Sequence, residues 1–186
     1  TVAGGAGNTA SGEESTVGGG WGNTASSDYS TVSGGNGNTA TDEYATVGGG
    51  LSNDASGVSS TVAGGQYNDA QADYATISGG GPSDPSDPAG TNNFVTDDYG
   101  VIGGGGNNQA GDNDGDTTNA TYATVGGGYS NTASQFGATV SGGDTNMASG
   151  LASTVGGGRD NTASGYYATV AGGGDNTASG LRSTVA

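Results

Sequence analysis

One hydrophobic position recurs along this chain at a nearly constant interval. Valine or isoleucine stands there at Val2, Val17, Val32, Val47, Val62, Ile77, Ile102, Val125, Val140, Val155, Val170 and Val185. Most steps are 15 residues, whereas the step before Ile102 is 25 and the step after it is 23. A fixed period that is interrupted in only two places is typical of a protein built from tandem structural repeats.

Each repeat contains two short segments in which apolar and polar side chains alternate, such as residues 15–18 (Ser-Thr-Val-Gly) and 23–26 (Asn-Thr-Ala-Ser). Side chains next to each other on a strand point to opposite faces, so Val and Ala are expected inward and both threonines outward. Glycine ends the segments, as tight corners require, and the glycine runs disfavour helix. The pattern predicts an all-β parallel β-solenoid (β-roll) of about twelve 15-residue coils, with two short strands per coil.

An asparagine also recurs about once per coil. The positions are Asn8, Asn23, Asn38, Asn53, Asn68, Asn108, Asn131, Asn146, Asn161 and Asn176. Stacked in register, these side chains would form an amide ladder in which each one bonds to its neighbour. Alternatively, asparagine stands there because it tolerates the left-handed conformation of a turn. The sequence leaves both explanations open.

Two insertions break the period and are expected to be loops that leave the solenoid. The first covers about residues 84–98 and contains Pro85 and Pro88, which cannot donate hydrogen bonds to a strand ladder. The second covers about residues 109–121, and loops on repeat proteins often carry function. Because the sequence begins and ends within a repeat, residues 1–186 are expected to be a single solenoid segment of a longer chain.

The charge balance excludes several functions for such a solenoid. Eighteen acidic residues face two arginines and no lysine, which gives a net charge of −16. Phosphate binding needs clustered cations, so nucleic acid is not an expected partner. Histidine, cysteine and lysine are absent, which removes the commonest catalytic bases and nucleophiles and predicts a non-enzymatic protein. No apolar run is long enough for a membrane-spanning helix.

The second insertion carries the best candidate for a cofactor site, which would hold a calcium ion. Asp112, Asp114 and Asp116 alternate with other residues around a glycine, and such a bend can converge hard oxygen ligands on Ca²⁺. The alternative is a solvated acidic loop that binds nothing. Asn119 lies in the same insertion and begins an Asn-Ala-Thr triplet, which makes it a candidate for N-glycosylation.

Six tyrosines occupy one position of the repeat: Tyr29, Tyr44, Tyr74, Tyr99, Tyr122 and Tyr167. An aromatic stripe of this kind can bind sugars, or it can fill space between packed chains. Packing is the favoured interpretation.

The paired half-turns of the repeat, such as Ala-Ser-Gly at residues 163–165 followed by Ala-Thr-Val-Ala-Gly at 168–172, resemble the head repeats of trimeric autotransporter adhesins of the YadA-like type. The resemblance covers all eleven full turns. This chain departs from the family in its longer period, its Gly-Gly-Gly corners and its acidity. The resemblance implies a left-handed β-roll, three chains side by side, and a position on an extracellular stalk.

The expected function is therefore a structural and adhesive segment of an extracellular fibre on a cell or virion surface, with a cell-surface, matrix or glycan ligand. One alternative is a viral tail-fibre shaft, since such fibres contain similar repeats. A second alternative is an ice-binding solenoid that uses the regular row of outward threonines. That row comprises Thr1, Thr16, Thr31, Thr46, Thr61, Thr76, Thr124, Thr139, Thr154, Thr169 and Thr184.

The chain is also expected to bind copies of itself, as a homotrimer or a filament. A core of one valine and one alanine per coil is thin, so further burial against other chains would stabilise the fold. Small side chains that flank the inward valines allow close approach. The expected inter-chain face comprises Thr16, Gly18, Thr31, Ser33, Thr61, Ala63 and Gly126.

Overall fold

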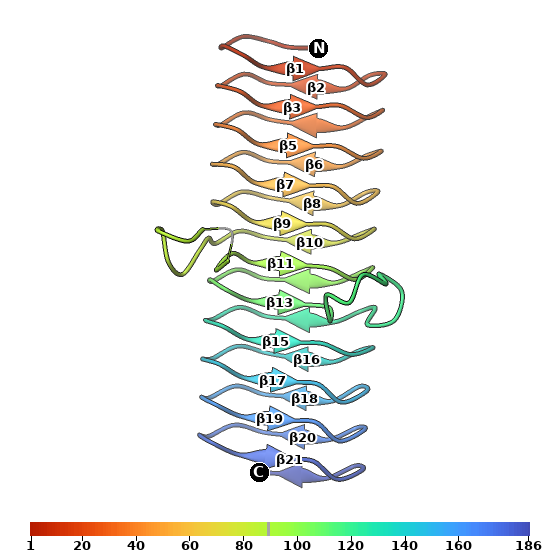
Figure 1. The fold of residues 1–186 in the computed structure, drawn as a ribbon, viewed down its shortest axis with the longest axis vertical. Helices are drawn as coiled ribbons and strands as arrows, with labels where there is room; N and C mark the ends of the chain where they lie inside the picture. Colours follow the sequence, from red (N-terminus) through yellow and green to blue (C-terminus); the bar gives the residue numbers. More distant parts are fainter. Residues whose placement is uncertain (89) are drawn as a thin grey trace.

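The computed structural model describes residues 1–88 and 90–186 and shows a rod of stacked coils (Figure 1). Every regular element in the described residues is a β-strand, and each strand is two residues long. The strands form two parallel sheets of 11 strands each, and a bridge between Val2 and Val17 extends one sheet by a further coil. The predicted solenoid of about twelve coils is confirmed. At about 4.8 Å per coil the rod is about 50 Å long.

We call the odd-numbered strands the alanine sheet. They are β1 (Thr9–Ala10), β3 (Thr24–Ala25), β5 (Thr39–Ala40), β7 (Asp54–Ala55), β9 (Asp69–Ala70), β11 (Phe94–Val95), β13 (Gln109–Ala110), β15 (Thr132–Ala133), β17 (Met147–Ala148), β19 (Thr162–Ala163) and β21 (Thr177–Ala178). We call the even-numbered strands the valine sheet. They are β2 (Thr16–Val17), β4 (Thr31–Val32), β6 (Thr46–Val47), β8 (Thr61–Val62), β10 (Thr76–Ile77), β12 (Val101–Ile102), β14 (Thr124–Val125), β16 (Thr139–Val140), β18 (Thr154–Val155), β20 (Thr169–Val170) and β22 (Thr184–Val185).

Each residue pairs with its own equivalent one coil away, as Val17 does with Val32 and Ala25 does with Ala40. The inward valines and alanines of the interior coils are completely buried, and the residue before each one in its strand, most often threonine, faces outward. The position two before each valine is also inward, for example Ser15 at 1% exposed. The inward and outward assignment made from alternation is confirmed.

The asparagines form a continuous amide ladder through the rod. Asn146 is typical: its Nδ2 donates to Asn131 Oδ1 at 3.1 Å and to the carbonyl oxygens of Gly142 and Gly158 at 3.0 and 2.9 Å, and its Oδ1 accepts from the backbone N of Asn161 at 3.1 Å. The interior asparagines are buried. Asn93, which the period obscured because of the first insertion, occupies the same ladder between Asn68 and Asn108.

The alternative explanation for asparagine, tolerance of a left-handed turn, is wrong for these residues. The left-handed conformation falls on the residue before each ladder asparagine except Asn93, as in Ser130 with φ of 54° and Asp160 with φ of 55°. The ladder asparagines are therefore selected for their amide groups, which satisfy backbone carbonyls of two successive coils.

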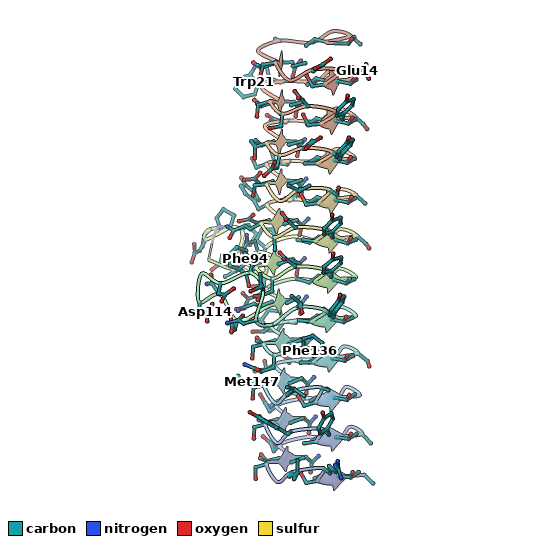
Figure 2. All side chains as sticks on the ribbon, turned by 90° about the vertical axis from the view of Figure 1, so that its right-hand side faces the viewer. Glu14, Trp21, Phe94, Asp114, Phe136 and Met147 are labelled. Carbon is teal, nitrogen blue, oxygen red and sulfur yellow. The ribbon has the colours of Figure 1, made fainter. Side chains whose placement is uncertain are left out.

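Both insertions leave the rod at corners. The first lies between β10 and β11, and the second lies between β13 and β14. Residues 94–98, which were expected to belong to the first loop, are part of the coil, and Gln109 is part of β13. An exit at the corner keeps both Asn93 and β11 in register, which preserves the ladders. The loops leave at opposite edges of the rod (Figure 1), and both extend over the same face (Figure 2).

In the described part of the chain, no helix is long and apolar enough to cross a membrane.

Candidate functional site

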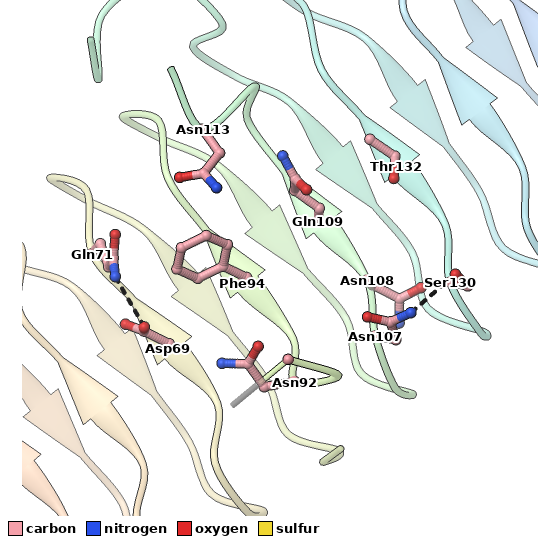
Figure 3. Close-up of a pocket in the computed structure, with 11 residues that line it drawn as sticks. Asp69, Gln71, Asn92, Phe94, Asn107, Asn108, Gln109, Asn113, Ser130 and Thr132 are labelled. Atoms are coloured by element: carbon pink, nitrogen blue, oxygen red, sulfur yellow. Dashed lines mark hydrogen bonds between the residues drawn. The ribbon is translucent and has the colours of Figure 1, made fainter. Parts of the chain in front are cut away.

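A polar cavity of about 480 Å³ lies between the two insertions, on the outer face of the alanine sheet (Figure 3). Four strands and both loops contribute to its lining. The lining residues are Asp69, Gln71, Gly90, Asn92, Phe94, Asn107, Asn108, Gln109, Asn113, Ser130 and Thr132. A cavity of this size falls within the range of sites for small molecules, about 300–1,000 Å³.

The first residue of each strand in the alanine sheet faces outward, and together these residues form a row along the rod. The cavity lies where this row is interrupted. This row is threonine in the first three strands and again in β15. Four consecutive strands between them instead carry Asp54, Asp69, Phe94 and Gln109. This departure from threonine in four consecutive repeats could have identified the site in the sequence.

Phe94 lies at the centre of the cavity, half-buried, with Asp69 and Gln109 as its neighbours in register. Gln71 Nε2 donates to Asp69 Oδ2 at 3.0 Å. On the far side, Asn107 Nδ2 donates to Ser130 Oγ at 3.0 Å. The cavity thus has one aromatic ring surrounded by amide groups, hydroxyls and one carboxyl group (Figure 3).

Asp54 and Asp69 are paired in register and half-buried. The Oδ1 atom of each is buried and has no hydrogen-bond partner among the described residues. Burial raises the pKa of Asp54. Burial, with a further contribution from Asp54, raises the pKa of Asp69 to about 6, although the hydrogen bond from Gln71 opposes the change.

This pair makes the stability of the rod depend on pH. The pKa of Asp69 is higher in the folded chain (about 6) than its ordinary value of 3.8, so the folded state binds the proton more tightly. The stabilisation is fully present below pH about 4 and is lost as pH rises through about 6. We expect the double variant Asp54→Thr/Asp69→Thr, which restores the threonine row, to raise the melting temperature by several degrees at pH 7.5 and by much less at pH 4.5.

Thermal unfolding followed by circular dichroism measures this difference. Asp175→Asn is the matched control, because Asp175 is an exposed acidic residue outside the pair. Removing it tests whether any loss of negative charge has the same effect. An equal gain for the double variant at both pH values would contradict the prediction.

The second loop is fixed by Asp97, which is buried and was expected to lie in the first insertion. Its Oδ1 accepts from the backbone N of Ala120 at 2.9 Å, and its Oδ2 accepts from the backbone N of Asp112 at 3.1 Å. Asp97 thereby holds both ends of the second loop against the coil. Sequence alone gave no signal for this role, because it depends on where the loop returns.

The three aspartates of the calcium prediction each accept hydrogen bonds within their own loop. Asp112 Oδ1 accepts from the backbone N of Asp114, and Asp114 Oδ1 accepts from that of Asp116 at 2.8 Å. Hydrogen bonds from Thr118 lower the pKa of Asp116. Across residues 1–88 and 90–186, no group of three acidic side chains is placed to hold a metal ion. Calcium binding would require these carboxylates to turn from their present partners, and it stays a prediction.

Asn119 is exposed, and its Nδ2 donates to Asp114 Oδ2 at 2.8 Å. A glycan on this nitrogen would displace that bond. Glycosylation of Asn119 stays a prediction.

The tyrosine column lies on an exposed corner between the two sheets. Rings in successive coils stack face to face, with centroids 4.7 Å apart for Tyr74 and Tyr99 and 5.0 Å apart for Tyr99 and Tyr122. These tyrosines have φ near 60°, a conformation uncommon for residues other than glycine. The rings pack on one another within the chain, and packing against other chains stays a prediction.

The seven residues of the expected inter-chain face lie together on the outer side of the valine sheet or at its edge. The three threonines are half-buried, whereas the residues that follow the strands are exposed: Gly18, Ser33, Ala63 and Gly126. The structure therefore places them on one surface of small side chains. Their contact with another chain stays a prediction.

One protein family matches this chain locally. The family described as the Ubiquitous surface protein adhesin repeat matches residues 138–150, which include β16, β17 and the ladder residue Asn146. No curated protein matches the chain. The matched segment spans nearly one coil, and the other coils repeat its pattern. The fold and this match together support the interpretation of the repeats as adhesin-like. They do not confirm the narrower assignment to YadA-like heads.

Proposed function

We propose that this chain is a non-enzymatic structural and adhesive segment of an extracellular fibre, on a cell or virion surface. The observation that carries the proposal is the coincidence of irregularities in an otherwise uniform rod. Both insertions and three of the four replaced threonines of the alanine sheet, at Asp69, Phe94 and Gln109, meet at one cavity. A rod of regular coils is a spacer, and a cavity on its side is where a ligand would attach.

A shortened rod tests this proposal. Deleting residues 82–91 and 112–119 restores the 15-residue step on both sides of Ile102 and leaves the ladder asparagines in place. Beads coated with the full chain should attach to cultured cells, collagen or mucin, and beads coated with the shortened rod should lose most of that attachment. Circular dichroism checks that the shortened rod remains β-folded. Equal attachment of the two rods to every surface would contradict the proposal.

The proposal includes side-by-side association of three chains through the valine sheet. Ser33 and Ser26 are both exposed and both follow a strand, but Ser33 lies on the valine sheet and Ser26 on the alanine sheet. We expect Ser33→Arg to shift the sedimentation coefficient toward that of a monomer, whereas Ser26→Arg leaves the trimer intact. A wild-type chain that sediments as a monomer would contradict this part of the proposal.

Gly126 is unsuitable for such a test, although it belongs to the same face. A Cβ atom there would lie closer than 3.0 Å to the carbonyl oxygen of Ser141 in the next coil. Any larger residue would therefore disturb the chain itself, and the effect could not be assigned to association.

A viral tail-fibre shaft and an ice-binding solenoid remain the alternatives. The outward threonine row of the valine sheet is interrupted by Val101, which is 37% exposed. No observation in the structure favours either alternative over attachment through the cavity.

A further inference from the structure

We infer that the cavity between the two insertions binds an uncharged sugar, which stacks on Phe94 and exchanges hydrogen bonds with the surrounding amide groups. The inference rests on the adhesive function proposed above and names the chemical class of its ligand. It is argued below from the aromatic ring, the polar groups, the charge and the support of the two loops.

Phe94 provides an apolar surface where the repeat has a polar side chain. It points outward from the alanine sheet, away from the core, at a position that is threonine in six of the eleven strands. A half-buried ring in a polar cavity gains little from its surroundings, and a partner with an apolar face would cover it. The C–H face of a pyranose ring is such a partner, and its edge carries hydroxyl groups.

The polar groups around the ring suit hydroxyl groups. Within the described part of the chain, no hydrogen bond engages the side-chain amides of Asn92 and Asn113, and each amide offers both donors and an acceptor. A sugar hydroxyl needs this combination, because it donates and accepts at once. The Asp69 carboxyl group lines the same cavity and adds an acceptor for a hydroxyl group.

The charge of the site excludes anionic ligands. The lining contains no arginine, and the chain has 18 acidic residues against two basic ones. A sulfated or carboxylated sugar would therefore meet repulsion from Asp69 and from the chain as a whole. A cationic ligand, such as a lysine side chain, would need only acceptors and would leave the amide donors unused. An uncharged sugar uses both kinds of group.

The site is held in place by the coil beneath it. Asn113 is fixed through its backbone N, which donates to Thr96 Oγ1 at 3.2 Å, and Asp97 anchors both ends of the same loop. In the first loop, Thr91 Oγ1 donates to the carbonyl oxygen of Asp87 at 2.7 Å, just before Asn92. Groups fixed before binding lose little entropy when a ligand arrives, which favours affinity.

Saturation-transfer NMR on the full chain tests the inference. The probes are galactose, mannose and N-acetylglucosamine, with N-acetylneuraminic acid and Nα-acetyl-lysine amide as the anionic and cationic comparisons. We expect transfer to at least one of the three neutral sugars and to neither charged probe. Phe94→Thr, which restores the residue typical of the row, should weaken that binding by at least about tenfold. Met147→Thr is the matched control, because Met147 occupies the same row outside the cavity.

Three outcomes would overturn the inference: no transfer to any neutral sugar, equal binding by the Phe94→Thr and Met147→Thr variants, or transfer to Nα-acetyl-lysine amide alone. The proposed adhesive function is tested separately, by the attachment of the shortened rod. If the shortened rod loses attachment to cells while no neutral sugar binds, the function stands and the ligand class is wrong. If shortening leaves attachment unchanged, the function itself is wrong.

Discussion

Replacing Asn131 with alanine is expected to cost the rod about 5 kcal/mol of its free energy of unfolding. The variant leaves the carbonyl oxygen of Gly127 and the backbone N of Asn146 without a partner. It also removes one of the two donors to the carbonyl oxygen of Gly143, which keeps its hydrogen bond from Tyr129 N. Asn131 is completely buried, each of the two unpaired groups costs about 1–3 kcal/mol, and the lost hydrogen bond to Gly143 costs about 1 kcal/mol more. The sum approaches the whole stability of an ordinary domain, about 5–15 kcal/mol.

The substitution should also uncouple the coils on its two sides in unfolding, because each coil of a solenoid contacts only its neighbours. Hydrogen exchange should then show the coils around residues 127–146 opening first. Urea denaturation measures the total loss. Asn36→Ala is the matched control, since Asn36 is exposed and its side chain makes no hydrogen bond in the described residues. Its cost should stay within about 0.5 kcal/mol.

Asn131→Asp separates the donor role from the acceptor role. The carboxylate can still accept from Asn146, but it cannot donate to Gly127 and Gly143 and it faces their oxygens. We expect it to be at least as damaging as Asn131→Ala at neutral pH. If either variant behaved like Asn36→Ala, the ladder would be a consequence of the fold and would not be a cause of its stability.

The repeat made the fold predictable, because one period fixes several structural features at once. When Val17 and Val32 are equivalent, parallel pairing in register follows, and alternation then decides that Thr16 lies outside and Ser15 inside. The choice between the two explanations for asparagine could not be made in this way. It depends on which residue of the corner has positive φ, and that is a property of the backbone path.

The candidate site was harder to predict because it arises where the period fails. The period shows that ten extra residues lie between two repeats, but it does not show where the insertion begins and ends. Phe94 and Asp97 were therefore assigned to a loop. The hydrogen-bond ladders decide the placement, since only an exit at the glycine corner keeps Asn93 stacked on Asn68. The cavity then forms between two loops that are separate in sequence, which no pattern within either loop indicates.

Gly128→Ala is expected to cost at least about 3 kcal/mol, although it adds a single methyl group. Gly128 has φ of 92°, and a Cβ atom there would lie closer than 3.0 Å to the carbonyl oxygen of Gly143 and to Asn131 Nδ2. The next coil cannot move away, because Tyr129 N donates to Gly143 O at 2.9 Å. The methyl group would therefore break the backbone ladder and the amide ladder together.

The matched control for this prediction is Gly22→Ala, measured by the same urea denaturation. Gly22 has φ of 65°, but a Cβ atom there meets no other atom within 4 Å. Its replacement carries only the strain of a left-handed residue, about 1 kcal/mol. Equal losses at Gly128 and Gly22 would mean that backbone conformation alone selects glycine at the corners. A larger loss at Gly128 would mean that the close stacking of coils selects glycine at the Gly-Gly-Gly corners, because a side chain there has no room between one coil and the next.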